Sequence, residues 1–490
     1  MKVSKKNTSL WALSIFIFAV MLSFYFRIAQ RIDINSDMAS GIVEAMDMTK
    51  GNVLLSGWSL STVSFYFTEI IWYALAILIG GHTYKIAYFM PALILTVLCV
   101  MMIISSENKK SAIIFTLFLF GAPAFFMARN VLTPFIHVGT YIFCLAAYCF
   151  TVRYVTYGCK AALAAMFAIL SLACFSDTIA IYISLVPALT VVMVSFLRSE
   201  FDKRWAAVLV VTVLAVAASV IITWVFLHYG FVVPGVQPTR FTTLDGIGKN
   251  VSVTFLGVMS LFDADFYGRD PRQSETVIRC MSFFMLAIFV LIVAMRAFKL
   301  RDSKDIFLLV AALIMPLAFI VSDVSVGVSS IRYILPFFIY GTVFISRVNT
   351  PLLNNTRVLA LIAVLAIIPS VHHIKSSIHL PKALNGMKGL SQVLKDNGLT
   401  NGYAEFWFAS ATSVYGQVQV APINYDGSHV IRRDWLSKAS WYNENNRFII
   451  IHDELLKKSA VSAYGEPDNI IRYNGYLVYV WNKKITATKQ

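Results

Sequence analysis

The fold class is decided by two stretches, residues 86–104 (IAYFMPALILTVLCVMMII) and residues 206–227 (AAVLVVTVLAVAASVIITWVFL). Neither contains a charged residue, and each is close to the roughly 20 apolar residues that a helix needs to cross the hydrocarbon core of a bilayer. Comparable runs recur along the first three quarters of the chain. The sequence therefore predicts an all-α, polytopic membrane protein.

The composition agrees with this reading. Of the 490 residues, 58% are hydrophobic and 14% are charged, whereas soluble proteins carry about 25% charged residues. A soluble enzyme is excluded. The net charge of +15, from 41 Lys and Arg against 26 Asp and Glu, would indicate nucleic acid only if it lay on one solvated face.

The basic residues instead follow the topology. Eleven crossings are expected: Leu10–Phe26, Ile86–Ile104, Ala112–Met127, Val131–Val152, Ala161–Cys174, Ile179–Leu197, Ala206–Leu227, Val277–Met295, Ile306–Val321, Ile334–Ile345 and Val358–Ile368. Alternate connections between them hold sixteen Lys and Arg but only five Asp and Glu, which is the positive-inside pattern. The N-terminus is expected inside and the C-terminus outside, with no nucleic-acid partner.

Two domains are expected, a membrane domain at 1–370 and an outer domain at 371–490. The membrane domain has outer loops at 27–85 and 228–276, and its apolar stretch Phe65–Ile79 is interpreted as a juxtamembrane or re-entrant helix. The outer domain alternates short β-rich runs with Gly, Asn and Asp turns. It is predicted to be a small α/β domain.

The first outer loop concentrates acids in a chain that has few. Asp37, Gly41 and Glu44 are spaced so that a helix from Ser36 would present them on one face. A carboxylate here can act as a general base or bind a substrate. The alternative is that Ser36 or Asp37 only caps the helix and that the other acids are solvated.

Glu69 lies within the apolar stretch of the same loop. A carboxylate is costly there unless it faces a polar cavity or a partner, so Glu69 is a functional candidate. The alternative is an interfacial helix from which Glu69 points to water.

Two further candidates, His137 and Asp177, are expected at the same outer face as Asp37 and Glu69. His137 is expected just inside a crossing, and Asp177 between two crossings. Taken singly, each also fits a helix cap or a buried polar group that is already satisfied.

Arginines at the outer face run against the charge rule and need another explanation. A lipid-linked phosphate supplies one, because guanidinium binds phosphate in a bidentate manner. Arg332 is the first candidate and Arg269 is another, while snorkelling to headgroups is the alternative.

Other patterns are less specific. Asp263 and Asp265 match a D-x-D pattern that can hold a divalent cation, and His372, His373 and His379 lack the spacing of a zinc site. Trp407 has a face suited to sugar stacking, as do Trp435 and Trp441, although such residues are often core.

Together these features resemble the GT-C membrane glycosyltransferases, which take sugar from a polyprenyl phosphate. The resemblance is carried by the loop Ser36-Asp37-Met38-Ala39 with Glu44, by Gly80-Gly81 after the apolar stretch, and by many short spans. Met38 stands where many such loops have a second acid. Trp58-Ser-Leu-Ser-Thr62 before Thr68-Glu69, and residues 402–407 (GYAEFW), look most like the serotype-converting O-antigen glucosyltransferases of bacteria and their phages.

The resemblance implies an inverting transfer of a hexose, glucose, from undecaprenyl phosphate to O-antigen lipopolysaccharide or another lipid-linked glycan. Asp37 would be the catalytic base, supported by Glu69. Substrate would be bound by Glu44, His137, Asp177, Arg332, Arg269 and Trp407. No cofactor or metal is expected. The resemblance also implies the bacterial inner membrane, a periplasmic C-terminal domain, and a donor-synthesising transferase and a flippase as partners.

Two other classes stay open on the residues alone. A transporter or flippase for lipid-linked sugar would also need many spans and a few buried polar groups, although most acids here cluster at one face and no inverted repeat is evident. An O-antigen ligase or polymerase would be expected to rely on arginines and a histidine in a large outer loop.

Overall fold

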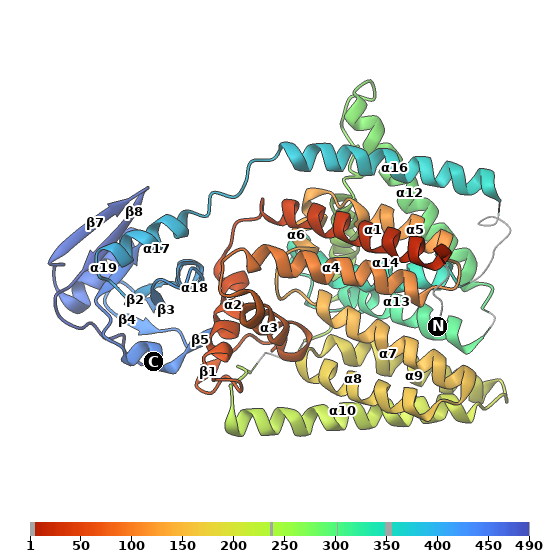
Figure 1. The fold of residues 1–490 in the computed structure, drawn as a ribbon, viewed down its shortest axis with the longest axis horizontal. Coiled ribbons are helices and arrows are strands. Elements are labelled where there is room, and N and C mark those ends of the chain that lie inside the picture. Colours follow the sequence, from red (N-terminus) through yellow and green to blue (C-terminus); the bar gives the residue numbers. More distant parts are fainter. Residues whose placement is uncertain (1–4, 236–238, 301, 348–354, 490) are drawn as a thin grey trace. The chain divides into compact units, whose positions relative to one another are not determined.

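Helices dominate the structure, a computed structural model that describes residues 5–235, 239–300, 302–347 and 355–489 (Figure 1). The chain forms two compact units. The helical unit comprises residues 1–29, 91–219 and 237–381, and the mixed unit comprises residues 30–90, 220–236 and 382–490. The mixed unit thus joins most of the first predicted loop, residues 27–85, to the C-terminal segment, a grouping that differs from the expected boundary at 370.

The long helices belong mostly to the helical unit. They are α1 (Lys5–Ala29), α4 (Ile86–Ser105), α5 (Lys109–Thr116), α6 (Phe125–Val131), α7 (Val138–Tyr157), α8 (Lys160–Ser176), α9 (Ile179–Leu197), α10 (Lys203–Tyr229), α11 (Leu244–Leu261), α12 (Ser274–Ala297), α13 (Ser303–Val321), α14 (Leu335–Ile345) and α16 (Thr356–His379). A 3₁₀ turn, η3 (Val328–Ile334), leads into α14. Within this unit α7 packs on α8, and α13 packs on both α9 and α14.

Eight helices in the described part of the chain are long and apolar enough to cross a membrane, as expected of a polytopic membrane protein. The number is lower than the eleven predicted. A ninth is counted if the bent pair 109–121 and 125–131 forms one span. The bend of 97° follows Gly121-Ala122-Pro123, where a proline without an N–H interrupts the helix.

The remaining predicted crossings fall on helices of different lengths. α8 has 17 residues, or about 25 Å of helix, which is less than a core of roughly 30 Å. The first predicted crossing, Leu10–Phe26, lies within α1 (Lys5–Ala29), which has 25 residues. The crossing predicted from Val131 begins only at Val138, so His137 precedes the helix instead of lying inside it.

Buried ion pairs join three helices of the helical unit. Asp305, which is 1% exposed, accepts hydrogen bonds from Arg296 at 2.9 Å and from Arg347 at 3.0 Å. Arg347 also binds Asp302 at 2.8 Å. The ends of α12, α13 and α14 are thus held by charges that are mutually compensated, as buried charges need to be.

The C-terminal part of the mixed unit is an α/β domain, as predicted. Its six-stranded sheet has the order β4-β3-β2-β6-β8-β7, from β2 (Asn401–Glu405), β3 (Gln419–Tyr425), β4 (Val430–Arg432), β6 (Phe448–Ile451), β7 (Asn469–Tyr473) and β8 (Tyr476–Val480). Only β3, β2 and β6 run parallel. Helices α17 (Gly386–Asp396), α18 (Phe406–Ser413) and α19 (Glu454–Tyr464) accompany the sheet (Figure 1).

The first predicted loop, residues 27–85, is largely built into this domain. Its helix α2 (Ser36–Thr49) packs on α18, and its short strand β1 (Trp58–Ser59) pairs with β5 (Ser437–Lys438). Asp47 on α2 binds Lys438 Nζ at 2.9 Å and the indole N–H of Trp58 at 2.8 Å. Residues 30–90 and the C-terminal segment therefore belong to one compact unit.

Candidate functional site

The predicted helix that carries the loop acids is confirmed, because α2 begins at Ser36. Its N-cap is Asn35, whose side-chain oxygen accepts a hydrogen bond from the Met38 N–H at 3.0 Å. The interpretation of Ser36 or Asp37 as the cap is therefore wrong. Asp37 is exposed in the first turn of α2, where the helix dipole favours a negative charge.

Glu44, two turns further along α2, has a different environment. It is 2% exposed, and its Oε1 has no hydrogen-bond partner among the described residues. Burial raises the pKa of Glu44 to about 8. The interpretation that the other loop acids are solvated is therefore wrong for Glu44, which holds a proton near neutral pH because the charged form is costly in an apolar setting.

Glu69 belongs to η1 (Tyr66–Ile70), a short π-helix that continues into α3 (Ile71–Gly80). It is 2% exposed, so the interpretation that Glu69 points to water is wrong. It interacts electrostatically with Tyr73 one turn later. The neighbouring Thr68 hydroxyl is buried and has no partner in the described parts of the chain.

The two segments that carry these acids pack together, because α2 contacts both η1 and α3 within the mixed unit. Three predicted residues, Asp37, Glu44 and Glu69, thus lie on two packed segments of one unit. Two of their carboxyl groups are buried and one is exposed. The raised pKa of Glu44 makes it a proton donor on the same helix as the exposed Asp37 carboxyl.

In the helical unit the structure brings His137 and Asp177 together. His137 Nδ1 donates to Asp177 Oδ2 at 2.7 Å, and the Thr140 hydroxyl donates to the same oxygen at 2.7 Å. Asp177 Oδ1 also accepts from the Ile179 N–H at 3.0 Å. Asp177 is thus a satisfied buried group that caps α9 and orients the imidazole of His137, leaving Nε2 as the basic nitrogen of the neutral ring.

The backbone at His137 is unusual. His137 has φ +75°, and Phe135 has φ +60°. Left-handed backbone costs of order 1 kcal/mol or more at a residue with a side chain, and it persists where the surroundings enforce it, as at many binding sites. The bond to Asp177 and the start of α7 at Val138 supply that enforcement.

Arg332 lies in the same unit, on η3. Its guanidinium is 5.6 Å from the ring centre of Tyr333, whose ring in turn lies 5.4 Å from that of His137. Arg332 Nε is buried without a partner among the described residues. Gly257 lets α11 approach η3 closely, because a Cβ at this position would lie 2.5 Å from the Ile331 side chain. A half-buried cation, an aromatic ring and an oriented imidazole therefore adjoin one another.

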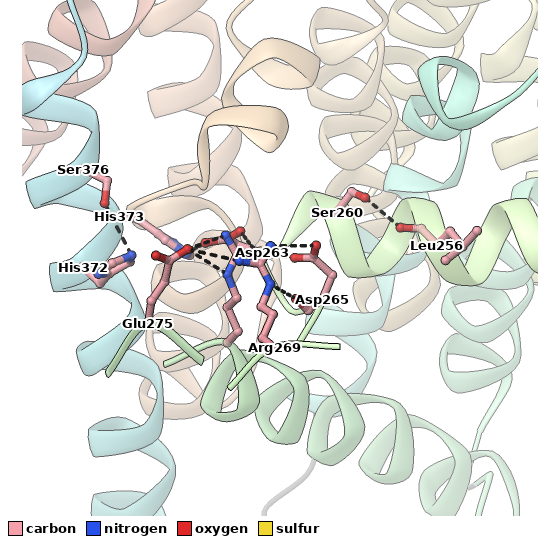
Figure 2. Close-up of polar contacts among 10 residues, drawn as sticks. Leu256, Ser260, Asp263, Asp265, Arg269, Glu275, His372, His373 and Ser376 are labelled. Carbon is pink, nitrogen blue, oxygen red and sulfur yellow. Dashed lines mark hydrogen bonds and ion pairs between the residues drawn. The ribbon is translucent and has the colours of Figure 1, made fainter. Parts of the chain in front are cut away.

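Arg269 lies in another cluster (Figure 2), where its Nη2 is 3.4 Å from Asp265 and its Nη1 is 3.5 Å from Glu275. Arg279 pairs with Asp263 and Asp265 and lies 2.9 Å from Glu275. Burial raises the pKa of Asp263 despite the attraction of Arg279. Since Arg269 is already paired with carboxylates, it is a poorer phosphate ligand than Arg332.

The D-x-D pattern belongs to the same cluster. The Asp263 and Asp265 carboxylates are compensated by Arg279, and His373 Nε2 lies 3.9 Å from Asp263. No group of three His, Cys, Asp or Glu side chains suited to a metal ion occurs in the described residues. We therefore interpret the contacts of Asp263 and Asp265 with Arg279 as an ion-pair network.

The three C-terminal tryptophans differ in exposure. Trp441 is 4% exposed and packs edge-on against Trp58. Trp435 is half-buried and stacks on Phe406 with ring centres 4.9 Å apart. Trp407, at the start of α18, is 51% exposed. Only Trp407 of the three offers a mostly exposed ring.

Several contributors were not found from the sequence. Thr140 follows His137 at the start of α7, and Tyr333 follows Arg332, so both could have been identified once their neighbours were singled out. Asn35 is a good helix cap directly before the acidic helix, and this signal was available in the sequence.

Comparison with known proteins adds no assignment, because neither the protein-family models nor the curated proteins give a significant match to this chain. The functional argument therefore rests on the residues described above.

Proposed function

We propose that this protein is a membrane glycosyltransferase that moves a hexose, glucose in the first instance, from undecaprenyl phosphate to a glycan acceptor such as O-antigen. In the proposed reaction, the acceptor hydroxyl loses its proton to the Asp37 carboxylate and its oxygen bonds to the anomeric carbon of the donor. The bond from that carbon to the phosphate oxygen breaks with inversion, and the electron pair leaves with undecaprenyl phosphate.

The observation that carries the proposal is the pair of buried carboxyl groups beside an exposed one in the first outer loop. Glu44 and Glu69 are each 2% exposed on segments that pack together. Burying an ionisable group is costly, and buried ionisable groups concentrate at functional sites. Asp37, on the helix that also holds Glu44, is exposed and suited to meeting an acceptor.

In the proposal, Asp37 is the general base, and a positioned base is worth roughly 10²–10⁴ in rate. Glu69 supports the acceptor or Asp37. Glu44 keeps a proton near neutral pH and can donate a hydrogen bond to a sugar oxygen. The buried Thr68 hydroxyl supplies a further polar contact.

The phosphate assignment is proposed independently, from the helical unit. Arg332 carries a buried nitrogen without a partner in the described residues, and it adjoins the ring of Tyr333. Cations that stabilise a leaving phosphate act where charge develops in the transition state. His137, oriented by Asp177, would add a hydrogen bond to a phosphate oxygen when it is protonated. We propose that Arg332 and His137 bind the donor phosphate. We also propose that the protein lies in the inner membrane of a bacterium.

The test is transfer of radiolabelled glucose from synthetic polyprenyl-phosphate glucose to purified O-antigen lipopolysaccharide by the full-length protein in detergent. The expected result is product with wild type and a loss of about 100-fold or more with Asp37→Asn. Glu69→Gln is expected to be impaired as well. Asp33→Asn, an exposed acid of the same loop, is the matched control and is expected to keep wild-type activity.

Each failure has its own meaning. Transfer that survives in Asp37→Asn would show that another group is the base. No product from the folded protein with any polyprenyl-phosphate sugar, together with movement of labelled lipid-linked sugar across vesicles, would replace the enzyme with a transporter. Joining of preassembled glycans would indicate a ligase or polymerase.

A further inference from the structure

Three parallel strands of the mixed unit end at one edge of the sheet. β2 lies between β3 and β6 and is parallel to both. The chain runs from β2 to β3 on one side and later returns to β6 on the other, so the direction of winding reverses at β2. In open α/β sheets, ligands bind outside the carboxyl ends of the strands at such a reversal.

The residues at this edge are polar and aromatic. β2 ends at Glu405 and is followed by Trp407 and Phe408, β3 ends at Tyr425, and β6 is followed by His452 and Asp453. We call Glu405, Trp407, Tyr425, His452 and Asp453 the carboxyl edge. The name refers to the strand ends that these residues follow.

Three residues of the carboxyl edge, Tyr425, His452 and Asp453, are in contact with one another. The Tyr425 hydroxyl donates to Asp453 Oδ2 at 2.7 Å and lies 3.2 Å from His452 Nε2. The His452 ring is 5.2 Å from that of Phe408 on α18. Burial and the nearby Asp453 and Glu405 carboxylates raise the pKa of Tyr425, so its hydroxyl stays protonated and can donate a hydrogen bond.

Trp407 is the exposed aromatic of the group. In α18, Phe406 and Ala409 are 2% and 1% exposed, whereas Trp407 is 51% exposed. Glu405 accepts a hydrogen bond from the Trp407 N–H at 3.0 Å, which holds the start of α18 in place. An exposed tryptophan ring on a helix can contact the apolar face of a ligand.

The strand ends at this edge carry carboxylates. Each of the three parallel strands is followed or ended by a carboxylate, namely Glu405, Asp426 and Asp453, in a protein whose net charge is +15. These carboxylates disfavour a phosphate, and the cation that lies nearby, Arg433, is stacked 4.4 Å from the ring centre of Phe406. Carboxylate, imidazole and phenol groups suit the hydroxyls of a neutral sugar, and the indole face suits its C–H groups.

We propose that the carboxyl edge binds a neutral saccharide, and that this saccharide is the acceptor glycan of the transfer reaction. The second half of this statement rests on the proposed function. The first half rests only on the mixed unit. Trp407 contacts the sugar ring in this proposal, and Tyr425, His452 and Asp453 bind its hydroxyls.

The test uses the full-length protein in detergent and O-antigen polysaccharide released from its lipid. Binding is measured by titration calorimetry, and transfer is measured against acceptor and donor separately. Trp407→Ala is expected to weaken polysaccharide binding about tenfold and to raise the acceptor KM by a similar factor, with kcat and the donor KM within twofold. Tyr425→Phe is expected to act in the same direction with a smaller effect. Ile470→Ala on β7, also an exposed apolar residue of this sheet, is the matched control.

The outcomes separate the two proposals. If Trp407→Ala and Tyr425→Phe leave binding and acceptor KM unchanged in a protein that transfers sugar, the carboxyl edge is not the acceptor site and the proposed function stands. If wild type binds polysaccharide through Trp407 but transfers nothing, the saccharide site stands and the transferase does not. The carboxyl-edge proposal would be overturned if wild type did not bind polysaccharide even at about millimolar concentration.

Discussion

The Ser36 hydroxyl accepts a hydrogen bond at 3.1 Å from the backbone N–H of Ala411, 375 residues further along the chain. Ser36 is the first residue of the acidic helix α2. Ala411 lies in α18, which begins at Phe406 and carries Trp407 as its second residue. The acids of the first loop and the carboxyl edge of the sheet therefore belong to one packed structure. A substitution that displaces α2 is therefore expected to displace α18 as well, and the reverse.

Replacing Asp47 is expected to loosen this structure. Asp47→Ala removes the ion pair with Lys438 and the hydrogen bonds from Trp58 and Asn52. Leaving these partners unpaired should lower the free energy of unfolding at pH 7 by about 2–4 kcal/mol. Thermal unfolding of the purified protein measures this loss, with the exposed Asp396→Ala as control.

The same variant has a predicted pH dependence. Burial raises the pKa of Asp47, but the Lys438, Trp58 and Asn52 contacts outweigh burial and hold the pKa below its ordinary value. The stability that Asp47 contributes is therefore present above about pH 4 and is lost as the pH falls through the lowered pKa. Wild type and Asp47→Ala should differ at pH 6–8 and converge toward pH 3. A difference that persists unchanged at pH 3 would contradict the electrostatic account.

Glu44 is expected to give the opposite dependence. Its pKa, raised to about 8, means that the folded protein keeps a proton that the unfolded chain releases above roughly pH 4.5. Stability should therefore fall as the pH rises from about 5 to 8 and level off above that. Glu44→Gln removes this titration, so its unfolding temperature should match wild type near pH 5 and exceed it at pH 8–9. An equal pH-dependent loss in both proteins would show that Glu44 does not titrate in this range.

His137 offers a test of the left-handed backbone. Asn tolerates φ +75° far better than a β-branched residue does. Both variants lose the bond to Asp177, so His137→Asn should be destabilised by about 1–3 kcal/mol, and His137→Val should lose about 1–3 kcal/mol more because of the backbone. If His137 binds donor phosphate, both variants should raise the donor KM. Thermal unfolding and donor titrations separate the two effects.

The two arginines are expected to differ. Arg332→Gln should reduce transfer about 100-fold or more and raise the donor KM, because it removes a cation whose Nε has no partner in the described residues. Arg269→Gln should change transfer less than about threefold, since Arg269 is exposed and held by Asp265 and Glu275. Equal effects of the two substitutions would remove the distinction.

Local patterns in the sequence predicted local structure well. The spacing of Asp37, Gly41 and Glu44 predicted a helix from Ser36, and α2 begins there. The β-rich runs at 417–420, 447–451 and 476–481 fall on β3, β6 and β8. Both signals depend on neighbours a few residues apart, which is the range over which helix and strand periodicity acts.

Features that depend on distant contacts were less accessible. The positive-inside pattern placed His137 and Asp177 at one face, yet only the fold shows that their side chains meet at 2.7 Å. Hydropathy also does not show that Gly121-Ala122-Pro123 bends the chain by 97° or that the helix at the fifth predicted crossing, α8, has only 17 residues. The Lys438–Asp47 pair, 391 residues apart, left no local trace.

The composite make-up of the mixed unit bears on how the protein is made. Its first segment ends at residue 90 and its last begins at residue 382, almost 300 residues later. At ribosomal rates of about 5–20 residues per second, roughly 15 to 60 s pass between the two. During that interval α2 lacks α18 and the loop lacks the partner of β1. A nascent chain stopped before Phe406 would therefore carry every acid of the first loop and still lack α18, on which α2 packs, and β5, with which β1 pairs.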